Sequence, residues 1–263
     1  MMYTHTYVPG VEFMRLDKYL TQLNIGSRSQ VKDLIKKGLV TVNGQTEKSP
    51  ERKIDEMIDV IICQGQTLSY QDKVYYMFHK PAGCVSATED RRDITVIDFL
   101  KKENRKDIFP VGRLDKDTEG LLIITNDGDL AHRLLSPVKH VEKCYLARLA
   151  HKITQDEILR IEQGLDIGEE KTTRPARFAW HTEADRDSDT PEALLTITEG
   201  KYHQVKRMFR AVGNEVTYLK RLSMGSLTLD ERLKPGEYRP LTDIELETLK
   251  GELYASRKTG NSI

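Results

Sequence analysis

Three carboxylates alternate along one polar segment of this 263-residue chain, and their spacing is the first indication of chemistry. Asp115, Asp117 and Glu119 lie in GRLDKDTEGLLIITNDGDL (112–130), directly before an apolar run. Alternating acids can bind calcium, act as a pair on a glycosidic bond, or face solvent in a polar turn. The segment alone leaves these three interpretations to be weighed.

The calcium interpretation fails on the sequence itself. The twelfth position of a calcium loop counted from Asp115 is Asn126, where a bidentate Glu is required, and a β-type apolar run follows Gly120. A glycosidase pair needs two acids across a sugar cleft, which nothing in the sequence indicates and nothing excludes. For an isolated pattern of this kind, a solvated turn is the default.

Charge is balanced over the whole chain but not along it. The 41 basic side chains equal the 41 acidic ones, so no overall positive surplus points to nucleic acid. Residues 201–221, however, hold six basic side chains against one acid, Glu215. A local surplus of this size can line an RNA groove in a neutral protein.

Cysteine usage and hydropathy indicate the compartment. Cys63, Cys84 and Cys144 are widely spaced and form no CxxC motif, which argues against a disulfide framework or a zinc site and favours a reducing cytosol. The apolar runs are far shorter than the ~20 residues of a membrane helix, and no signal-peptide pattern is present. We therefore expect a cytoplasmic protein that does not enter a membrane.

The apolar pattern predicts two domains. Residues 14–63 combine helical spacing with a short strand and an Asn43-Gly44 turn, a strong hairpin signal. Residues 64–73 are polar and are expected to be a linker, and residues 251–263 a flexible tail. The larger domain is expected over residues 74–250.

In the larger domain, strands outnumber the helices that could connect parallel neighbours. Strands are expected near 74–78, 121–124, 143–149, 177–180, 193–198 and 215–219, and helices near 130–135, 155–163, 203–212 and 243–250. This excess predicts the α+β class, with a mixed, mainly antiparallel sheet.

The small domain contains a basic helix face. Its basic side chains are Arg28, Lys32, Lys36 and Lys37, with Asp33 as the only acid among them. Charge alone favours an ordinary solvated face. However, RLDKYLTQLNIGSRSQVKDLIKKGLVTVNGQ (15–45) resembles the S4 RNA-binding domain, a small α/β module. The resemblance implies rRNA or tRNA binding, with the four basic side chains contacting phosphates.

The acidic segment also belongs to a wider pattern. GRLDKDTEGLLIITNDG resembles the signature of pseudouridine synthases, and in particular of the small-subunit rRNA family. Four further segments resemble motifs of that family in the same order: YMFHKPAG (76–83), EKCY (142–145), EGKYHQVKRMFRAVGN (199–214) and GEYRPLT (236–242). The resemblance implies a pseudouridine synthase catalytic domain.

The resemblance also implies roles for individual residues. Asp115 corresponds to the catalytic carboxylate, Lys206 to its basic partner, and Tyr145 to an aromatic that stacks on uracil and can shuttle a proton. Arg113 corresponds to the residue that helps to displace the target base. Asp117 is expected to support the loop. His203 and Gln204 are expected to orient the helix of Lys206, and Arg207 and Arg210 to contact RNA.

The implied reaction isomerises uridine to pseudouridine, adds and removes no group, and therefore needs no cofactor and no metal. KYHQVKRM (201–208) and EKCY resemble the corresponding segments of 16S rRNA synthases, which implies a 16S target of the uridine-516 type. The expected partner is rRNA, free or in an assembling ribosomal subunit, and the expected enzyme is a monomer. The alternatives are a 23S rRNA synthase and a non-catalytic S4-containing ribosome-assembly factor.

Overall fold

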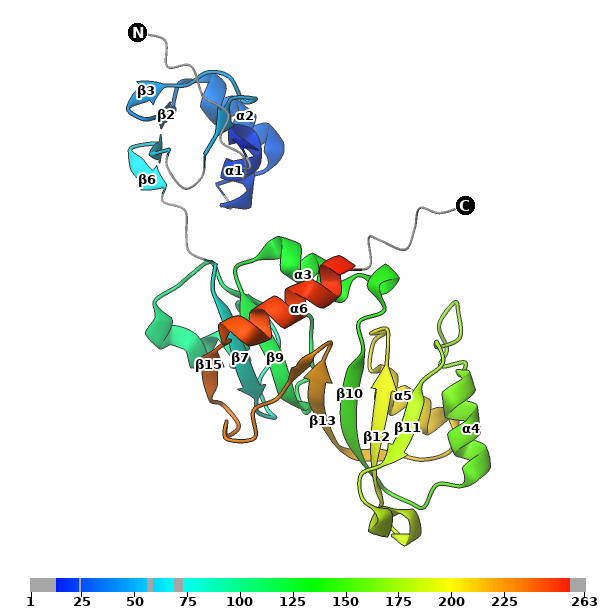
Figure 1. Cartoon of the computed structure of the whole chain (residues 1–263). Helices are drawn as coiled ribbons and strands as arrows, with labels where there is room; N and C mark the ends of the chain where they lie inside the picture. The colour runs from blue at the N-terminus through cyan, green and yellow to red at the C-terminus, as the bar shows by residue number, and fades with distance from the viewer. Residues whose placement is uncertain (1–12, 24, 56–58, 69–72, 256–263) are drawn as a thin grey trace. The chain divides into compact units, whose positions relative to one another are not determined.

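The computed structural model describes residues 13–23, 25–55, 59–68 and 73–255 (Figure 1). The chain divides into two compact units, residues 1–72 and residues 73–263, and each unit has its own hydrophobic core. Within the described ranges, no helix is long and apolar enough to cross a membrane.

The first unit packs two helices against short strands. Its elements are β1 (Met14–Arg15), α1 (Leu16–Gln22), α2 (Arg28–Lys36), β2 (Val40–Val42), β3 (Gln45–Thr46), β4 (Lys53–Ile54), β5 (Ile61–Cys63) and β6 (Gln66–Leu68). α2 begins at a capping box, in which Ser27 and Gln30 satisfy each other's backbone N–H groups. The sheet order is β3-β2-β5-β6, β1 pairs with β4, and Leu16, Leu20 and Ile35 are fully buried.

Two tight turns set the register of this four-stranded sheet. Both residues of Asn43-Gly44 adopt left-handed backbone conformations, so the predicted hairpin between β2 and β3 is confirmed. Gln64-Gly65 does the same between β5 and β6. The prediction of a linker over 64–73 is therefore wrong for residues 64–68, because a polar hairpin turn has the composition of a linker. Residues 69–72 lie outside the described ranges.

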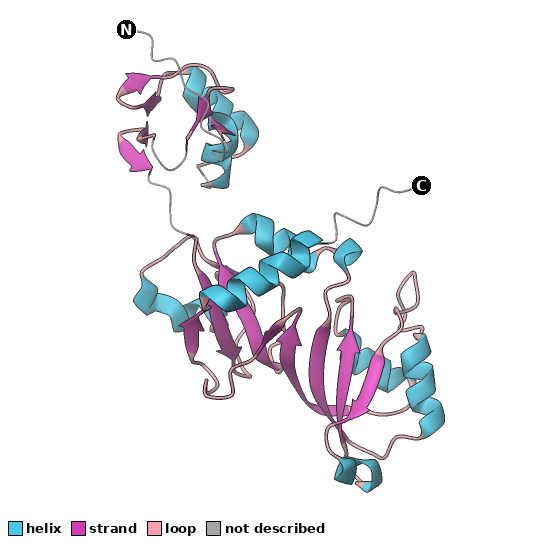
Figure 2. Cartoon of the chain, viewed as in Figure 1, coloured by secondary structure: helices cyan, strands magenta, loops and turns pink. Residues whose placement is uncertain are grey.

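The second unit is built on one nine-stranded sheet (Figures 1 and 2). Its strands are β7 (Tyr75–Lys80), β8 (Phe109–Pro110), β9 (Glu119–Thr125), β10 (Lys143–Leu149), β11 (Arg177–Trp180), β12 (Glu192–Ile197), β13 (Val216–Met224), β14 (Leu227–Thr228) and β15 (Tyr238–Pro240). Its helices are η1 (Val96–Glu103), α3 (Gly128–Leu135), η2 (Pro137–Lys139), α4 (Gln155–Gln163), η3 (Glu183–Asp187), α5 (Gln204–Ala211) and α6 (Asp243–Ala255).

The strand order in this sheet is β11-β12-β10-β13-β9-β7-β15, with β14 beside β13 and β8 beside β9. Among the paired strands of the described residues, β13 and β9 run parallel and the other pairs run antiparallel. The predicted α+β class with a mainly antiparallel mixed sheet is therefore confirmed.

Both faces of the central strands are buried. Phe78 of β7 and Leu122 of β9 join a core formed with η1, α4 and α5, whereas Met77 and Leu121 join a core formed with α3 and α6. A strand covered on both faces needs apolar residues in succession instead of alternation. The unbroken apolar run that follows the acidic segment is thus explained by helices on both sides of β9.

Most predicted elements of this unit lie close to their observed bounds. Strands β10 and β11 and helix α4 match their predicted ranges. β13 runs to Met224, beyond its predicted end at residue 219. α6 is longer as well, so the prediction of a tail is wrong for residues 251–255, where Leu253 packs into the core of α3 and α6. Residues 256–263 lie outside the described ranges.

Candidate active site

A cleft of about 950 Å³ opens in the second unit, where β10 and β13 meet the loops around residues 112–116 and 198–203. Its lining includes Arg113, Asp115, Lys143, Tyr145, His203 and Arg221. A recess of about 80 Å³ shares Asp115 and Tyr145 with the cleft. Residues predicted for the site from separate sequence motifs therefore line one cavity.

Two side chains hold the carboxylate of Asp115. Lys206 Nζ lies 3.2 Å from Asp115 Oδ2, and His203 Nε2 lies 3.3 Å from Asp115 Oδ1. Lys206 also donates a hydrogen bond to Asp117 Oδ1 at 2.5 Å. Burial lowers the pKa of Lys206, but its hydrogen bonds to Asp117 and Asp115 outweigh burial and raise the pKa above its ordinary value. The ammonium group therefore stays charged between the two carboxylates.

Of the three acids of the alternating segment, Asp115 and Asp117 share Lys206, and Glu119 has a different partner. Asp117 is 74 % exposed and pairs with Lys206, whose hydrogen bond lowers the pKa of Asp117. Glu119 accepts a hydrogen bond from the Tyr218 hydroxyl at 2.8 Å. In the described part of the chain, no group of three His, Cys, Asp or Glu side chains is placed to hold a metal ion.

A buried lysine fixes the loop that carries Asp115. Lys80, at the end of β7, has no solvent exposure. Its Nζ donates to the carbonyl oxygens of Pro81, Lys116 and Thr118 at 3.0, 3.3 and 2.9 Å. Burial lowers the pKa of Lys80. Two of its three acceptors lie within three residues after Asp115, so Lys80 ties the loop to the central sheet.

The Lys80→Met variant tests this tie. Methionine fills a similar volume but removes all three hydrogen bonds, one of them to the buried carbonyl oxygen of Thr118, so we expect a loss of about 3 kcal/mol in the free energy of unfolding. Chemical denaturation measures that loss. The matched variant Lys102→Met, at an exposed position on η1, should stay within about 0.5 kcal/mol of wild type. Equal stability of the two variants would contradict the structural role of Lys80.

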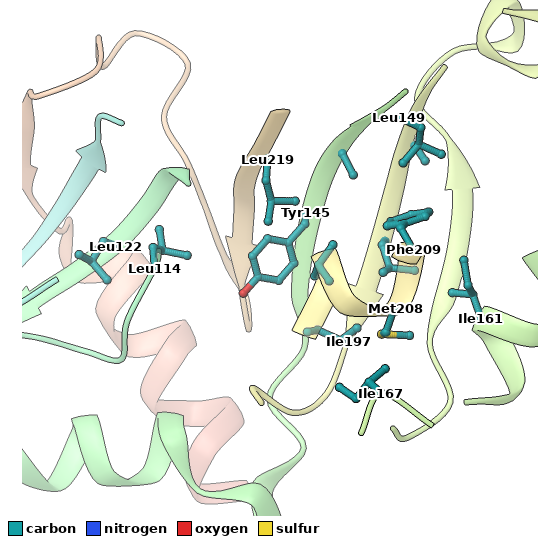
Figure 3. Close-up of a cluster of buried hydrophobic side chains, with 14 of the residues drawn as sticks. Leu114, Leu122, Tyr145, Leu149, Ile161, Ile167, Ile197, Met208, Phe209 and Leu219 are labelled. Atoms are coloured by element: carbon teal, nitrogen blue, oxygen red, sulfur yellow. The ribbon is translucent and has the colours of Figure 1, made fainter. Parts of the chain in front are cut away.

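Tyr145 presents an aromatic ring to the cleft from β10. The side chain is 8 % exposed and belongs to the core that includes Leu114 and Leu219. Figure 3 shows its ring beside Leu219 and extending toward the side on which Leu114 lies. A ring held by apolar neighbours has little freedom to lose when a base stacks against it, which suits it to bind an unstacked base.

A strained turn places His203 against Asp115. His203 is the N-cap of α5 and adopts a left-handed backbone conformation, with φ of 49° and ψ of 34°. This conformation costs a non-glycine residue roughly 1–2 kcal/mol and is typical of functional sites. The ring of Tyr202, which is 70 % exposed, stacks on the imidazole with the two centroids 3.8 Å apart. The turn therefore also places an aromatic ring at the mouth of the cleft.

The other basic residues predicted for RNA contact lie in different surroundings. Arg113 is exposed and lines the cleft. Arg210 is exposed on α5 and is not among the residues that line the cleft. Arg207 pairs with Glu169 at 2.5 Å and donates to the carbonyl oxygen of Ile167. This geometry does not support the prediction of an RNA contact at Arg207, because its guanidinium is occupied within the protein.

The basic face predicted on α2 is present in the first unit. Its four side chains are exposed: Arg28, Lys32, Lys36 and Lys37. Val31 and Ile35 of the same helix are fully buried in the core of the unit. The helix therefore offers its basic side chains to solvent, as phosphate contacts require.

Two buried basic residues of the cleft were not predicted as site residues. Lys143 is 8 % exposed and Arg221 is 3 % exposed, and both line the cleft. Lys143 could have been found, because it stands two residues before Tyr145 on a strand and so shares its face. Arg221 had no such signal, because its position depends on the pairing register of β13 with β10.

Comparison with known proteins identifies both units. The family described as RNA pseudouridylate synthase matches residues 74–211, and the S4 domain matches residues 14–60. A protein of Bacillus subtilis named as an uncharacterized RNA pseudouridine synthase is 49 % identical over 237 residues, covering 90 % of this chain and 98 % of the relative.

Two further matches cover nearly the same part of the chain. The ribosomal small subunit pseudouridine synthase A of Vibrio cholerae is 42 % identical, covering 90 % of this chain and 99 % of its own. A crystal structure of a pseudouridylate synthase is 38 % identical with a TM-score of 0.64, again covering 90 % of this chain and 99 % of its own. The chain therefore belongs to the RNA pseudouridine synthases, isomerases of uridine in RNA, and carries an S4 domain ahead of its catalytic unit.

Proposed function

We propose that this enzyme converts a specific uridine of 16S rRNA to pseudouridine, with Asp115 as its catalytic carboxylate. The observation that carries the proposal is the position of Asp115 between Lys206 and His203, in a cleft shared with Tyr145. An acid, a fixed cation and an aromatic ring in one partly buried cleft are the groups that this isomerisation needs.

Asp115 acts at the sugar. The reaction breaks the bond between C1′ and N1, turns the base, and rejoins it through C5, so its composition is unchanged and no cofactor enters. The carboxylate either adds to the substrate or stabilises the positive charge that develops on the ribose. Both roles require a carboxylate held in one place, and Lys206 and His203 hold one oxygen each.

Tyr145 and Arg113 act on the base. A uridine inside an RNA structure has to leave its stack to enter the cleft, at a cost of a few kcal/mol. Tyr145 offsets part of that cost by stacking on the uracil, and its hydroxyl is the proposed proton shuttle during the isomerisation. Arg113 is exposed in the wall of the same cleft, where it can take the place of the displaced base.

The choice of 16S rRNA rests on the relatives. The protein of Vibrio cholerae is named as a ribosomal small subunit synthase and matches both units of this chain. The S4 unit supplies a second RNA contact, because its basic α2 face can bind phosphates without reading sequence. We propose that the enzyme acts as a monomer in the cytoplasm, where free thiols such as those of Cys63, Cys84 and Cys144 stay reduced.

Mapping the product tests this proposal. The purified chain is incubated with 16S and 23S rRNA from cells that lack it, and pseudouridine is then located chemically along both RNAs. We expect one modified uridine in 16S rRNA. Modification of 23S rRNA instead would favour a large-subunit synthase. Tight binding without any pseudouridine would indicate a non-catalytic RNA-binding factor.

The salt dependence of binding tests the S4 unit. We expect Lys32→Gln and Lys36→Gln in the full chain each to weaken rRNA binding and to lower the slope of log Kd against log salt by about one, because each removes one phosphate contact. Arg186→Gln is the control, because it removes an exposed basic charge from the loop 182–191 of the second unit, and it should leave the slope unchanged. Unchanged slopes for both lysine variants would remove the α2 face from the RNA interface.

A further inference from the structure

Two buried cations in the cleft have no part in the mechanism so far. Lys143 and Arg221 are each more than nine-tenths buried, and neither forms an ion pair with any residue that the structure describes. Burying an unpaired charge is costly, and such charges concentrate at functional sites. The acids nearby have other partners: Asp115 has Lys206 and His203, and Glu199 accepts from Gln204.

The strand register places both cations beside Tyr145. Arg221 of β13 pairs directly with Tyr145 of β10, and paired residues of antiparallel strands point to the same face of the sheet. Lys143 stands two residues before Tyr145 on the same strand and therefore shares that face as well. The three side chains form one continuous surface, and all three line the cleft.

The guanidinium of Arg221 uses one N–H donor within the protein and leaves another without a partner among the described residues. Its Nε donates to the carbonyl oxygen of Leu121 at 2.8 Å, which fixes the plane of the group. Its Nη2 is buried and has no hydrogen-bond partner among the described residues. The Nζ of Lys143 donates to the carbonyl oxygen of Val141, and burial together with the nearby charge of Arg221 lowers the pKa of Lys143 to about 8. The pair therefore places positive charge and an unused donor at one point of the cleft, which suits an anionic group.

The depth of the pair decides between two anions that RNA could supply. A backbone phosphate stays near the solvent, within reach of exposed groups at the cleft mouth such as Arg113 and Lys116. Arg221 and Lys143 instead lie beside the ring on which the base is proposed to stack. The anion that forms at that depth is the uracil itself, once it separates from the ribose.

We propose that Arg221, assisted by Lys143, stabilises the negative charge that the uracil acquires when its glycosidic bond breaks. The inference rests on the proposed function. As the bond between C1′ and N1 breaks, its electron pair goes to the uracil and spreads over both carbonyl oxygens, while the ribose charge is met by Asp115. C5 then bonds to C1′, the proton on C5 leaves, and N1 gains a proton, so that atoms and charge balance.

The test separates binding of RNA from the rate of the chemical step. Arg221→Gln and Arg221→Lys are made in the full chain, and single-turnover rates at saturating rRNA are compared with the Kd over a range of salt. We expect Arg221→Gln to lower the rate by about 100-fold or more, as the loss of a preorganised donor does, with Kd and its salt slope unchanged. Arg221→Lys should recover part of the rate.

Lys143→Gln provides a second measurement, because the hydrogen bond of Lys143 stays within its own segment, at Val141, whereas that of Arg221 joins β13 to Leu121 of β9. We expect the rate to fall about tenfold, again with the Kd unchanged, and Lys143→Arg to restore it. Arg148→Gln is the matched control on the same strand: Arg148 is exposed, pairs with Glu192 and does not line the cleft. Its rate should equal that of wild type.

Two outcomes would overturn the inference. If Arg221→Gln raised the Kd and lowered its salt slope by about one, with an unchanged rate at saturating rRNA, Arg221 would bind a phosphate instead. Unchanged rates for Arg221→Gln and Lys143→Gln would show that the cations are structural. Failure of the proposed function is distinct from both, because wild type and Arg148→Gln would then form no pseudouridine in the same assay.

Discussion

Replacing Asp115 with asparagine is expected to abolish pseudouridine formation while leaving the fold and the RNA affinity close to those of wild type. The amide has the shape of the carboxylate and still accepts a hydrogen bond from Lys206, but it carries no charge and is a poor nucleophile. Loss of a group that acts on the reacting atoms typically lowers the rate by a factor on the order of 10⁴ or more. Single-turnover assays with saturating rRNA measure the rate.

The structure also limits what else this variant changes. Lys206 keeps Asp117 as a partner, and the pair that it loses with Asp115 is partly exposed to solvent. A pair of that kind contributes about 1 kcal/mol or less to stability, so the melting temperature should fall only slightly. RNA binding, measured by filter retention, should stay within about threefold, because phosphate contacts made elsewhere dominate affinity.

Asp117→Asn is the matched control. It makes the same chemical change two residues away, in a side chain that is 74 % exposed and contacts the same lysine. Its rate should stay within about tenfold of wild type, because Lys206 retains Asp115. Comparable activity of the Asp115→Asn variant and wild type would remove Asp115 from the chemistry. Equal losses in both variants would assign the effect to Lys206 and the loop as a unit.

The sequence predicted the parts of the site that short motifs carry. Asp115 and Tyr145 were assigned because their short segments resemble family motifs, although the acidic segment taken alone favours a solvated turn. Lys206 stands on a helix whose bounds the apolar pattern predicted to within one residue. These predictions needed only local structure, because neighbours in a motif stay together whatever the rest of the chain does. The contact between Lys206 and Asp115 followed from the resemblance alone, since the two are 91 positions apart.

The remaining features depend on tertiary structure. Lys80 stands at the end of an apolar strand, and a lysine there is ordinarily assigned to solvent, since this side chain is almost never fully buried without a partner. Its three carbonyl acceptors come together only when the loop of Asp115 folds over β7. Arg221 faces the cleft because the pairing of β13 shifts register opposite Cys144 and Tyr145. No pattern in a single strand reveals such a shift.

The second large effect is expected at Gly120, where the acidic segment enters β9. Gly120 has φ of 105°, a backbone conformation that favours glycine, and it pairs in parallel with Arg221 of β13. A Cβ at this position would overlap the backbone nitrogen and oxygen of Arg221, which cannot move without breaking the sheet. Gly120→Ala should therefore lower the free energy of unfolding by about 4 kcal/mol, the sum of backbone strain and overpacking.

The position of Gly120 makes this an effect on the site as well as on the fold. The glycine lets β9 approach β13 closely, and that approach sets the strand that carries Arg221 beside the loop that carries Asp115. We therefore expect Gly120→Ala to lose activity even below its melting temperature. Gly128→Ala is the control: no atom lies within 4 Å of its added Cβ, and denaturation should show stability within about 0.5 kcal/mol of wild type. If Gly120→Ala were as stable and active as Gly128→Ala, the positions of Arg221 and Asp115 in the cleft would not depend on the close packing of β9 on β13.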